Sequence, residues 1–366
     1  MGNGQGSLEG VVMRSFWSGK RVLVTGHTGF KGSWLSTWLV QLGAKVFGYS
    51  LDPDTASSLF CQLNLASHVD HFVADIRNAE LIGARVGEVN PDVVFHLAAQ
   101  PLVRRSYREA SYTWQTNVMG TVNLLEALRN MRSRCSAVFV TTDKVYENRE
   151  WLYAYRESDP LGGYDPYSSS KAAAEIAVSS WRDSFFPSGG LVFPAVRVAT
   201  ARAGNVIGGG DWAEDRIVPD LVRSLAKGTV VQVRNPQSVR PWQHVLDPLS
   251  GYLRLAQRMH ETEEQELQSC FNFGPGAESS RTVRDLVTES LRHWEGQWVD
   301  ASERNAVHEA GLLGLTIEKA RSVLQWQPTL DFSDSVRQTI EWYRSVHEGA
   351  HAIDITRQQI QAFQKR

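Results

Sequence analysis

A glycine-rich loop near the start of the chain constrains the fold more than any other feature. It runs through Gly26, Gly29 and Gly32 and joins a short β-branched strand at 21–25 to an amphipathic helix at 33–42. Glycines at this spacing let the backbone turn sharply and approach a diphosphate, whose charge then faces the free N–H groups of the helix. A tight turn without a ligand is the alternative. The place of the loop, between a buried strand and a helix, favours a dinucleotide site.

The following chain alternates between strand-like and helix-like segments. Apolar, strand-like runs recur at 45–49, 69–73, 91–97, 137–141 and 194–198. Helical patterns fill the gaps and continue at 217–227 and 246–260. Repeated strand–helix–strand units build a parallel sheet with right-handed crossovers. We therefore predict an α/β fold, a doubly wound, Rossmann-like parallel sheet with a smaller C-terminal substrate-binding lobe.

The alternation weakens after about residue 198, and this change suggests the domain organisation. We predict a flexible tail over 1–19, a dinucleotide-binding domain over 20–198, a mainly substrate-binding lobe over 199–350 and a C-terminal tail over 351–366. A segment near 240–260 is expected to return to the first domain. A chain of 366 residues is long enough for one large domain or two coupled domains.

Charge and cysteine content narrow the class of protein. The chain has 38 Lys and Arg against 40 Asp and Glu, so it lacks the excess of positive charge that nucleic-acid binding needs. Its three cysteines form no CxxC pair, which favours a reducing compartment, and no apolar run is long enough to span a bilayer. We expect a cytoplasmic protein with a small-molecule ligand, without nucleic acid, membrane or metal as a partner.

Residues at the end of the second predicted strand indicate which dinucleotide is bound. Ser50 stands where an acid would contact the adenosine ribose, and Asp52 follows. No arginine stands there to receive a 2′-phosphate, so the sequence favours NAD over NADP. Asp75, after the third strand, is placed to contact the adenine or, equally well, to cap the next helix.

Tyr167 and Lys171 lie four residues apart at the start of a predicted helix, on one face of it. An ammonium favours the phenolate of a neighbouring tyrosine, and a phenolate takes the proton of an alcohol as hydride leaves its carbon. Such pairs are common by chance. The position of this pair after a fifth parallel strand favours a catalytic role.

Thr142, Asp143 and Lys144 follow that fifth strand, at the edge of the sheet where doubly wound proteins bind ligands. Alcohol oxidation needs only the hydroxyl and the Tyr/Lys pair. The additional acid and amine therefore suggest a further proton-transfer step. The structural alternative is that Asp143 caps the next segment and Lys144 pairs with it.

Longer motifs resemble those of the extended short-chain dehydrogenase/reductase superfamily. They are the loop at 25–32, HLAAQ at 96–100, TNVMGT at 116–121 and the Tyr167/Lys171 pair. More specific motifs resemble the nucleotide-sugar 4,6-dehydratases, and among these the members that act on CDP-glucose; they lie at 26–34, 162–168, 202–212 and 240–245. The similarity extends from about residue 21 to at least residue 342.

The resemblance implies a redox-neutral reaction on one bound nucleotide sugar, with NAD as the cofactor. Tyr167 would deprotonate the C4 hydroxyl while Thr142 hydrogen-bonds it, and hydride would pass from C4 to NAD. Asp143 would act as the acid when water is lost across C5 and C6, and the hydride would return to C6. Many relatives have a glutamate as the C5 base where this chain has Lys144. The identity of that base stays open.

The resemblance also implies which residues hold the two ligands, and it implies a homo-oligomer. The cofactor would contact Gly26, Thr28, Gly29, Phe30, Lys31, Gly32, Asp75, Ile76, Leu97, Ala98, Ala99, Thr116, Tyr167 and Lys171. Asn205, Arg216 and Arg240 would hold the substrate diphosphate, for which the guanidinium fork is suited, and Arg105 or alternatively Arg104 would contact the sugar.

Two other functions fit part of this pattern. An epimerase or decarboxylase of the same superfamily needs the cofactor and the Tyr/Lys pair but does not need Asp143 and Lys144 as an acid and a base. A non-catalytic dinucleotide sensor has the same fold but typically loses the tyrosine, which is present here at Tyr167.

Overall fold

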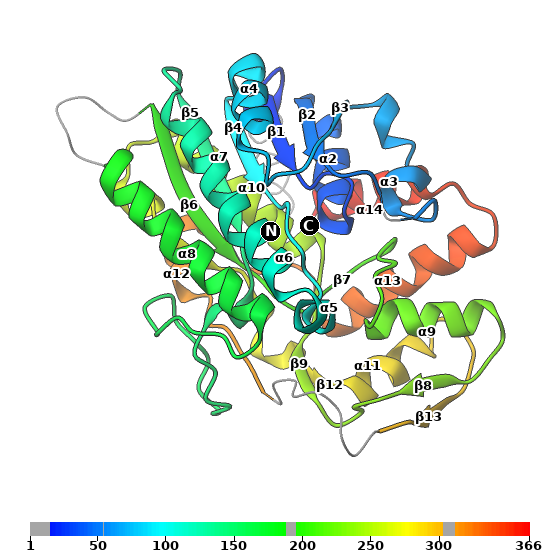
Figure 1. Ribbon diagram of the computed structural model, residues 1–366. Coiled ribbons are helices and arrows are strands. Elements are labelled where there is room, and N and C mark those ends of the chain that lie inside the picture. Colours follow the sequence, from blue (N-terminus) through cyan, green and yellow to red (C-terminus); the bar gives the residue numbers. More distant parts are fainter. Residues whose placement is uncertain (1–14, 54, 188–194, 303–311) are drawn as a thin grey trace, which may run out of the picture.

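Seven parallel strands, all within the described residues, form the central sheet of the computed structural model (Figure 1). The structure describes residues 15–53, 55–187, 195–302 and 312–366. The strand order is β3-β2-β1-β4-β5-β6-β11, and every neighbouring pair is parallel. This order is that of a doubly wound dinucleotide-binding sheet, so the predicted fold class is confirmed.

The six predicted strands are present with slightly shifted ends. They are β1 (Arg21–Thr25), β2 (Lys45–Ser50), β3 (Asp70–Val73), β4 (Val93–His96), β5 (Cys135–Val140) and β6 (Val196–Arg202). The seventh strand, β11 (Cys270–Asn272), was not predicted. It spans three residues, which is too short for a periodic pattern, and only its pairing with β6 defines it.

Helices cover both faces of the sheet. On one face lie α4 (Ala79–Val89), α7 (Gly120–Arg129) and α8 (Pro166–Phe185), and on the other lie α2 (Phe30–Gln41) and α10 (Leu246–Glu261). Alternate residues of one strand point to opposite faces of the sheet. Val22 and Val24 of β1 pack on the α2 side, and Leu23 packs on the α7 side. Burial on both faces explains why the strands read as continuous apolar runs.

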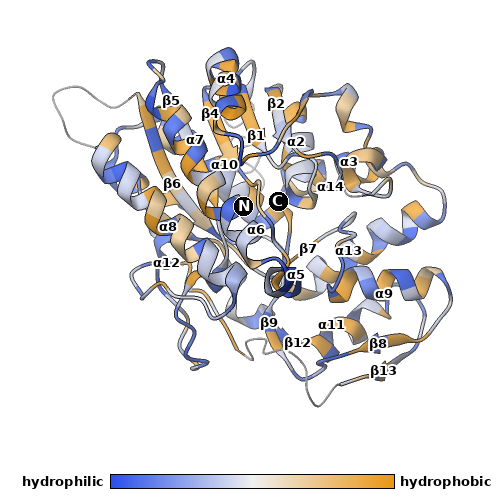
Figure 2. Cartoon of the chain, in the orientation of Figure 1, coloured by the Kyte–Doolittle hydropathy of each residue, from blue (hydrophilic) through white to orange (hydrophobic). Residues whose placement is uncertain are grey.

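The distribution of hydropathy follows these layers (Figure 2). Apolar residues concentrate on the strands and on the helix sides that meet them. Among the described helices, none carries an apolar stretch that would cross a membrane.

Short elements of the second half of the chain form a smaller lobe beside the carboxyl ends of the strands (Figure 1). It contains α9 (Ile217–Ala226), α11 (Val283–Ser290) and α13 (Phe332–His347). Three two-stranded sheets accompany them: β7 (Val206–Ile207) with β10 (Gln243–His244), β8 (Val231–Val233) with β13 (Trp298–Asp300), and β9 (Val239–Pro241) with β12 (Ser280–Thr282).

The predicted boundary at residue 198 falls inside β6, which continues to Arg202. The chain then alternates between the two parts. After the first segment of the lobe, α10 packs against β5 and α2, and β11 joins the sheet. α12 (Glu318–Leu324) packs on α10 and β11.

Described residues of both predicted tails pack against the body of the protein. Trp17 is fully buried, and its ring lies 6.0 Å from that of Phe95 in β4. The predicted C-terminal tail forms α14 (Ala352–Phe363), which packs on α2 through the rings of Phe363 and Trp38 at 5.6 Å. Its buried residues recur at helical spacing, and this stripe is what packs against the body of the protein. Residues 1–14 of the predicted N-terminal tail lie outside the described residues.

Candidate active site

A cavity of about 1340 Å³ lies at the carboxyl ends of the strands, between the sheet and the smaller lobe. Segments that follow β1, β2, β3, β4 and β5 contribute to its lining, and so do residues from the segment 203–240, which follows β6. All the catalytic, cofactor and substrate residues predicted from the sequence line this one cavity. The topology therefore brings together positions that are more than 200 residues apart, such as Gly26 and Arg240.

The glycine loop forms a cradle that side chains would fill. Gly26 has a φ of +75°, and a Cβ there would lie 2.7 Å from the backbone nitrogen of Ala98. A Cβ on Gly32 would lie 2.1 Å from the carbonyl oxygen of Gly26. Gly29 is the N-cap residue of α2, whose first N–H groups are free for an anion. The loop and the helix start fit the diphosphate of a dinucleotide.

The ends of β2 and β3 complete this side of the cavity. The hydroxyl groups of Ser50 and Thr28 are 2.8 Å apart. The Asp75 carboxylate accepts hydrogen bonds from the side chain of Arg77, and this pairing holds the pKa of Asp75 below its usual value. The N-cap of α4 is Asn78, which accepts a hydrogen bond from the Leu81 N–H. Asp75 therefore does not cap that helix, and the cap alternative is wrong.

Tyr167 and Lys171 lie in the first two turns of α8. Asp165 caps this helix by accepting a hydrogen bond from the Ser168 N–H at 2.9 Å, and it thereby sets where the helix begins. The Lys171 Nζ donates to the carbonyl oxygen of Val140, at the end of β5, at 3.1 Å. The tyrosine and the lysine thus face the strand end that carries Thr142.

Burial dominates the electrostatics of this pair. It raises the pKa of Tyr167 to about 12, against the opposing effect of a hydrogen bond between Tyr167 and Thr142. It also lowers the pKa of Lys171 to about 8, although Glu175 acts in the other direction. The spacing predicts that the Lys171 ammonium, together with the positive nicotinamide, favours the phenolate of Tyr167. Burial opposes this effect, because desolvation raises the pKa of the phenol, and the catalytic role of the pair stays a prediction.

Asp143 lines the cavity and is almost completely buried. Its carboxylate accepts hydrogen bonds from Thr142 and from the Asn205 Nδ2, each at 2.9 Å, and the Lys144 Nζ lies 3.6 Å away. A Cβ on Gly204 would come within 2.0 Å of this carboxylate, so glycine makes room for it. The N-cap of the short turn at 143–145 is Thr142 and not Asp143, whereas the pairing with Lys144 is present.

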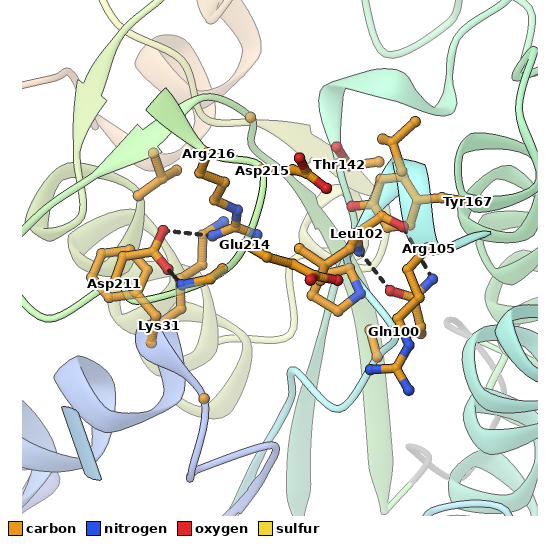
Figure 3. A pocket seen from close by; sticks show the side chains of 18 of the residues that line it. Lys31, Gln100, Leu102, Arg105, Thr142, Tyr167, Asp211, Glu214, Asp215 and Arg216 are labelled. Atoms are coloured by element: carbon orange, nitrogen blue, oxygen red, sulfur yellow. Dashed lines mark hydrogen bonds and ion pairs between the residues drawn. The ribbon is translucent and has the colours of Figure 1, made fainter. Parts of the chain in front are cut away.

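The predicted substrate arginines line the cavity, and each has a protein partner. Figure 3 shows Arg216 beside Asp211, and Arg105 near Tyr167. Arg216 pairs with Asp211 at 2.7 Å, and Arg105 pairs with Glu109 at 3.0 Å. The Arg240 Nη1 donates to the carbonyl of Val239. Arg104, the alternative to Arg105, lies 3.5 Å from Asp215. Asn205, predicted at the diphosphate, also lines the cavity, and its Nδ2 donates to the carboxylate of Asp143.

Lys31 lies on the Arg216 side of the cavity, opposite Thr142 and Tyr167 (Figure 3). Burial lowers its pKa to about 7, and the nearby Arg216 lowers it further, while Asp143 acts in the opposite direction. A lysine in the glycine loop therefore faces both the cofactor cradle and the predicted diphosphate site.

Sequence reasoning missed the charged residues at the lobe end of the cavity. Arg234 of the lobe pairs with Asp215 at 2.7 Å and with Asp220 of α9 at 3.2 Å, and Arg223 pairs with Asp220 at 2.8 Å. All four line the cavity. Of these, only Asp215 lies near a quoted motif, since 202–212 ends just before it, and no periodic pattern marks the others.

The chain is similar to known proteins in both sequence and fold. The profile of the family GDP-mannose 4,6 dehydratase matches residues 23–339. The CDP-glucose 4,6-dehydratase of Salmonella typhimurium is 45% identical over 352 residues, which cover 96% of this chain and 98% of that protein. The dTDP-glucose 4,6-dehydratase of Haemophilus influenzae is 26% identical, with 88% of this chain and 97% of that protein covered.

Solved structures share the fold at lower identity. The dTDP-glucose 4,6-dehydratase of Bacillus anthracis, in complex with NAD, has a TM-score of 0.73 at 23% identity and covers 89% of this chain and 97% of its own. The UDP-glucose 4-epimerase of Stenotrophomonas maltophila, with bound NAD, has a TM-score of 0.76 at 22% identity and covers 90% of this chain and 100% of its own. Both support the doubly wound fold.

Proposed function

The chain belongs to the GDP-mannose 4,6-dehydratase family. From this membership and from its similarity to a CDP-glucose 4,6-dehydratase, we propose that it converts CDP-glucose into CDP-4-keto-6-deoxyglucose and water through bound NAD. The resemblance to nucleotide-sugar 4,6-dehydratases is confirmed by the family match. The identity of 45% over nearly the whole of both chains supports CDP-glucose as the substrate.

One observation carries the dehydratase function. The cavity combines a Tyr/Lys pair with a buried carboxylate, Asp143, whose neighbour Lys144 lies 3.6 Å away. An epimerase needs only the first pair, because it returns hydride to the carbon from which the hydride came. A dehydratase needs a second acid and a base to remove water, and Asp143 and Lys144 provide both groups in one place.

NAD is proposed to lie across the carboxyl ends of β1 to β4, with its diphosphate on the glycine loop. The cradle at Gly26, Gly29 and Gly32 and the free N–H groups of α2 support this position. When bound, NAD supplies the acceptor for a hydride from C4 and the donor of a hydride to C6. The residues of the chain perform the proton transfers.

Tyr167 is proposed to take the proton of the C4 hydroxyl, and Thr142, bonded to Tyr167, orients that hydroxyl. Since burial raises the pKa of Tyr167 to about 12, the phenolate needs positive charge beside it. Lys171, which is held by the Val140 carbonyl, is the proposed source of that charge within the chain.

Asp143 and Lys144 are proposed to act as one unit in the loss of water. In their ion pair Lys144 holds the proton, whereas elimination needs a protonated Asp143 and a neutral Lys144. Transfer of one proton within the pair, whose N–O separation is 3.6 Å, provides this form. Lys144 then accepts the C5 proton, Asp143 donates to the departing C6 hydroxyl, and the ion pair is restored. Once C6 has received its hydride, Lys144 gives a proton to C5, and the proton that Tyr167 took from the C4 hydroxyl replaces it on Lys144; this completes the product and restores the phenolate and the ion pair.

The substrate diphosphate is proposed to lie between Arg216 and Arg240, with the sugar directed toward Tyr167 and Arg105. Arginine suits this role because its fork donates two charge-assisted bonds to phosphate. Asn205 is proposed to help by fixing Asp143, to which it donates at 2.9 Å. We further propose a cytoplasmic homo-oligomer, and light scattering on the purified protein tests the assembly.

The test is turnover of CDP-glucose by the purified protein with NAD. A 4-keto-6-deoxy product has a characteristic alkaline absorbance, and its formation is expected with CDP-glucose and much less with UDP-glucose or dTDP-glucose. Conversion to a C4 epimer without that absorbance would point to the epimerase alternative. Binding of NAD without any turnover of the three sugars would point to the sensor.

A further inference from the structure

One buried carboxylate beneath the cavity has no part in the proposed reaction. Glu175 lies on α8, one turn beyond Lys171, and its side chain and that of Arg202 are each 3% exposed. The Glu175 carboxylate accepts hydrogen bonds from the hydroxyls of Thr141 at 2.5 Å and Thr200 at 2.7 Å. It also accepts two bonds from Arg202, from Nε at 3.1 Å and from Nη2 at 3.0 Å.

Arg202 extends this network to other elements. Its Nη1 donates to the Tyr146 hydroxyl at 2.8 Å and to the carbonyl of Glu157 at 3.2 Å. The Tyr146 hydroxyl in turn donates to the Asn272 Oδ1 of β11 at 2.7 Å. The network therefore joins α8 to the ends of β5, β6 and β11, just below the cavity.

The ends of β5 and β6, which this network joins, are followed at once by residues proposed to act in the reaction. Thr141 precedes Thr142 and Asp143, and Arg202 lies three residues before Asn205. Neither Glu175 nor Arg202 lines the cavity itself. A shift of this pair would therefore act on the reaction through the groups that it holds.

The burial of the Glu175–Arg202 ion pair is not explained by fold stability alone. Removing two charges from water is costly, and apolar residues of similar volume often stabilise a fold equally well or better. Burial acts to raise the pKa of Glu175, but Arg202, Thr141 and Thr200 outweigh it and keep the pKa below its usual value. The carboxylate consequently stays ionised, and its charge acts on its surroundings.

The group that responds to this charge is Lys171. Other titratable groups near Lys171 are Tyr167 on the same helix, Lys31 on α2 and His96 on β4. Burial lowers the pKa of His96 to about 3, so it is neutral, and Lys31 has the same sign of charge as Lys171. Glu175 is the group that opposes the desolvation of Lys171, whose pKa is about 8.

We propose that the Glu175–Arg202 pair is a positioning device for the reaction: Glu175 keeps Lys171 protonated, and the pair together fixes the strand ends that carry Thr142 and Asn205. This inference rests on the proposed function. A protonated Lys171 is what makes the Tyr167 phenolate accessible, so the pair acts on the chemistry without contact with either ligand.

The test is the pH profile of kcat for CDP-glucose in Glu175→Gln, which keeps the shape of the side chain and removes its charge. In the wild type, kcat is expected to fall as the pH rises through the pKa of Lys171, about 8. In the variant this fall should occur at a pH lower by about 1 unit or more, with KM little changed. The matched control is Thr200→Val, which removes one hydrogen bond to Glu175 but leaves its charge. Its profile should keep the wild-type position.

Because Glu175→Gln leaves Arg202 buried without its carboxylate, the double variant Glu175→Gln/Arg202→Met is measured beside it. If the single variant does not fold, the double variant decides. The inference would be overturned if, in whichever variant folds, kcat declined with rising pH at the same pH as in the wild type. Loss of turnover in the wild type itself would instead refute the proposed function, so the two failures are distinguishable.

Discussion

Replacing Asp143 by asparagine should stop the proposed reaction half-way. The variant still oxidises C4, because Thr142, Tyr167 and Lys171 are unchanged, but it has no acid for the departing C6 hydroxyl. The amide has nearly the shape of the carboxylate. Its oxygen can still accept the bond from the Asn205 Nδ2, which is 2.9 Å long in the native protein.

The size of the effect follows from the contacts of Asp143. The bond from Thr142, at 2.9 Å, and the ion pair with Lys144, at 3.6 Å, are the interactions at risk. Loss of one hydrogen bond costs about 0.5–1.5 kcal/mol, or up to about 3 kcal/mol when a charged group takes part, which most domains tolerate. Loss of a general acid lowers a rate by roughly 10²- to 10⁴-fold, or about 3–5 kcal/mol in the barrier. Elimination should therefore slow strongly in a variant that still folds.

The assay uses CDP-glucose with deuterium at C4. The wild type should deliver the label to C6 of the product, whereas Asp143→Asn should retain it on NADH, seen as lasting near-ultraviolet absorbance of the bound cofactor. The control is Glu150→Gln, which removes an exposed carboxylate at the rim of the same cavity. Normal delivery of deuterium to C6 by Asp143→Asn would refute the acid role.

Four further predictions test other parts of the site. Tyr167→Phe should abolish turnover while NAD binding, measured by calorimetry, is kept; residual turnover near the wild-type rate would exclude the tyrosine. Arg240→Ala should raise KM by an amount equivalent to about 1.5–3 kcal/mol with little change in kcat, and an unchanged KM would place the diphosphate elsewhere. Gly204→Ala should mimic the half-reaction of Asp143→Asn, because its Cβ would lie 2.0 Å from that carboxylate; full activity would contradict the close packing. Lys31→Met should raise the Tm of the ligand-free protein, because the pKa of Lys31 falls from 10.5 to about 7 on folding. Burial of this charged lysine lowers the free energy of unfolding by its full amount below pH 7, and by progressively less as the pH rises toward 10.5. A gain in Tm that is absent at low pH or grows with pH would contradict this reading.

Local features of the sequence were enough for most of the sheet and for the members of the site. The strand at 21–25 is apolar at every central position because both of its faces are buried, and that pattern is visible without the fold. The loop glycines are recognisable because a positive φ at Gly26 and close backbone contact at Gly32 admit no other residue easily. Family motifs then identified the cavity residues one by one.

Predictions at the chain ends and at the domain boundary were less successful. The position of residues 351–366 at the end of the chain predicts a tail, yet α14 packs on α2 through Phe363 and Trp38. β11 spans only three residues, and β6 runs through the predicted boundary. In each case the deciding contact is with a segment distant in the sequence.

The sequence by itself determined the strand and helix pattern, the glycine cradle and the residue types of the site, because periodicity, backbone conformation and motif spacing are local properties of the chain. Tertiary structure decided the electrostatics. Tyr167 and Lys171 have the same spacing in any helix, but their pKa values of about 12 and about 8 depend on how deeply the assembled fold buries them. The same holds for Glu175, whose partner Arg202 is 27 residues away. Desolvation and charge act through space, so only the assembled fold decides how such groups ionise.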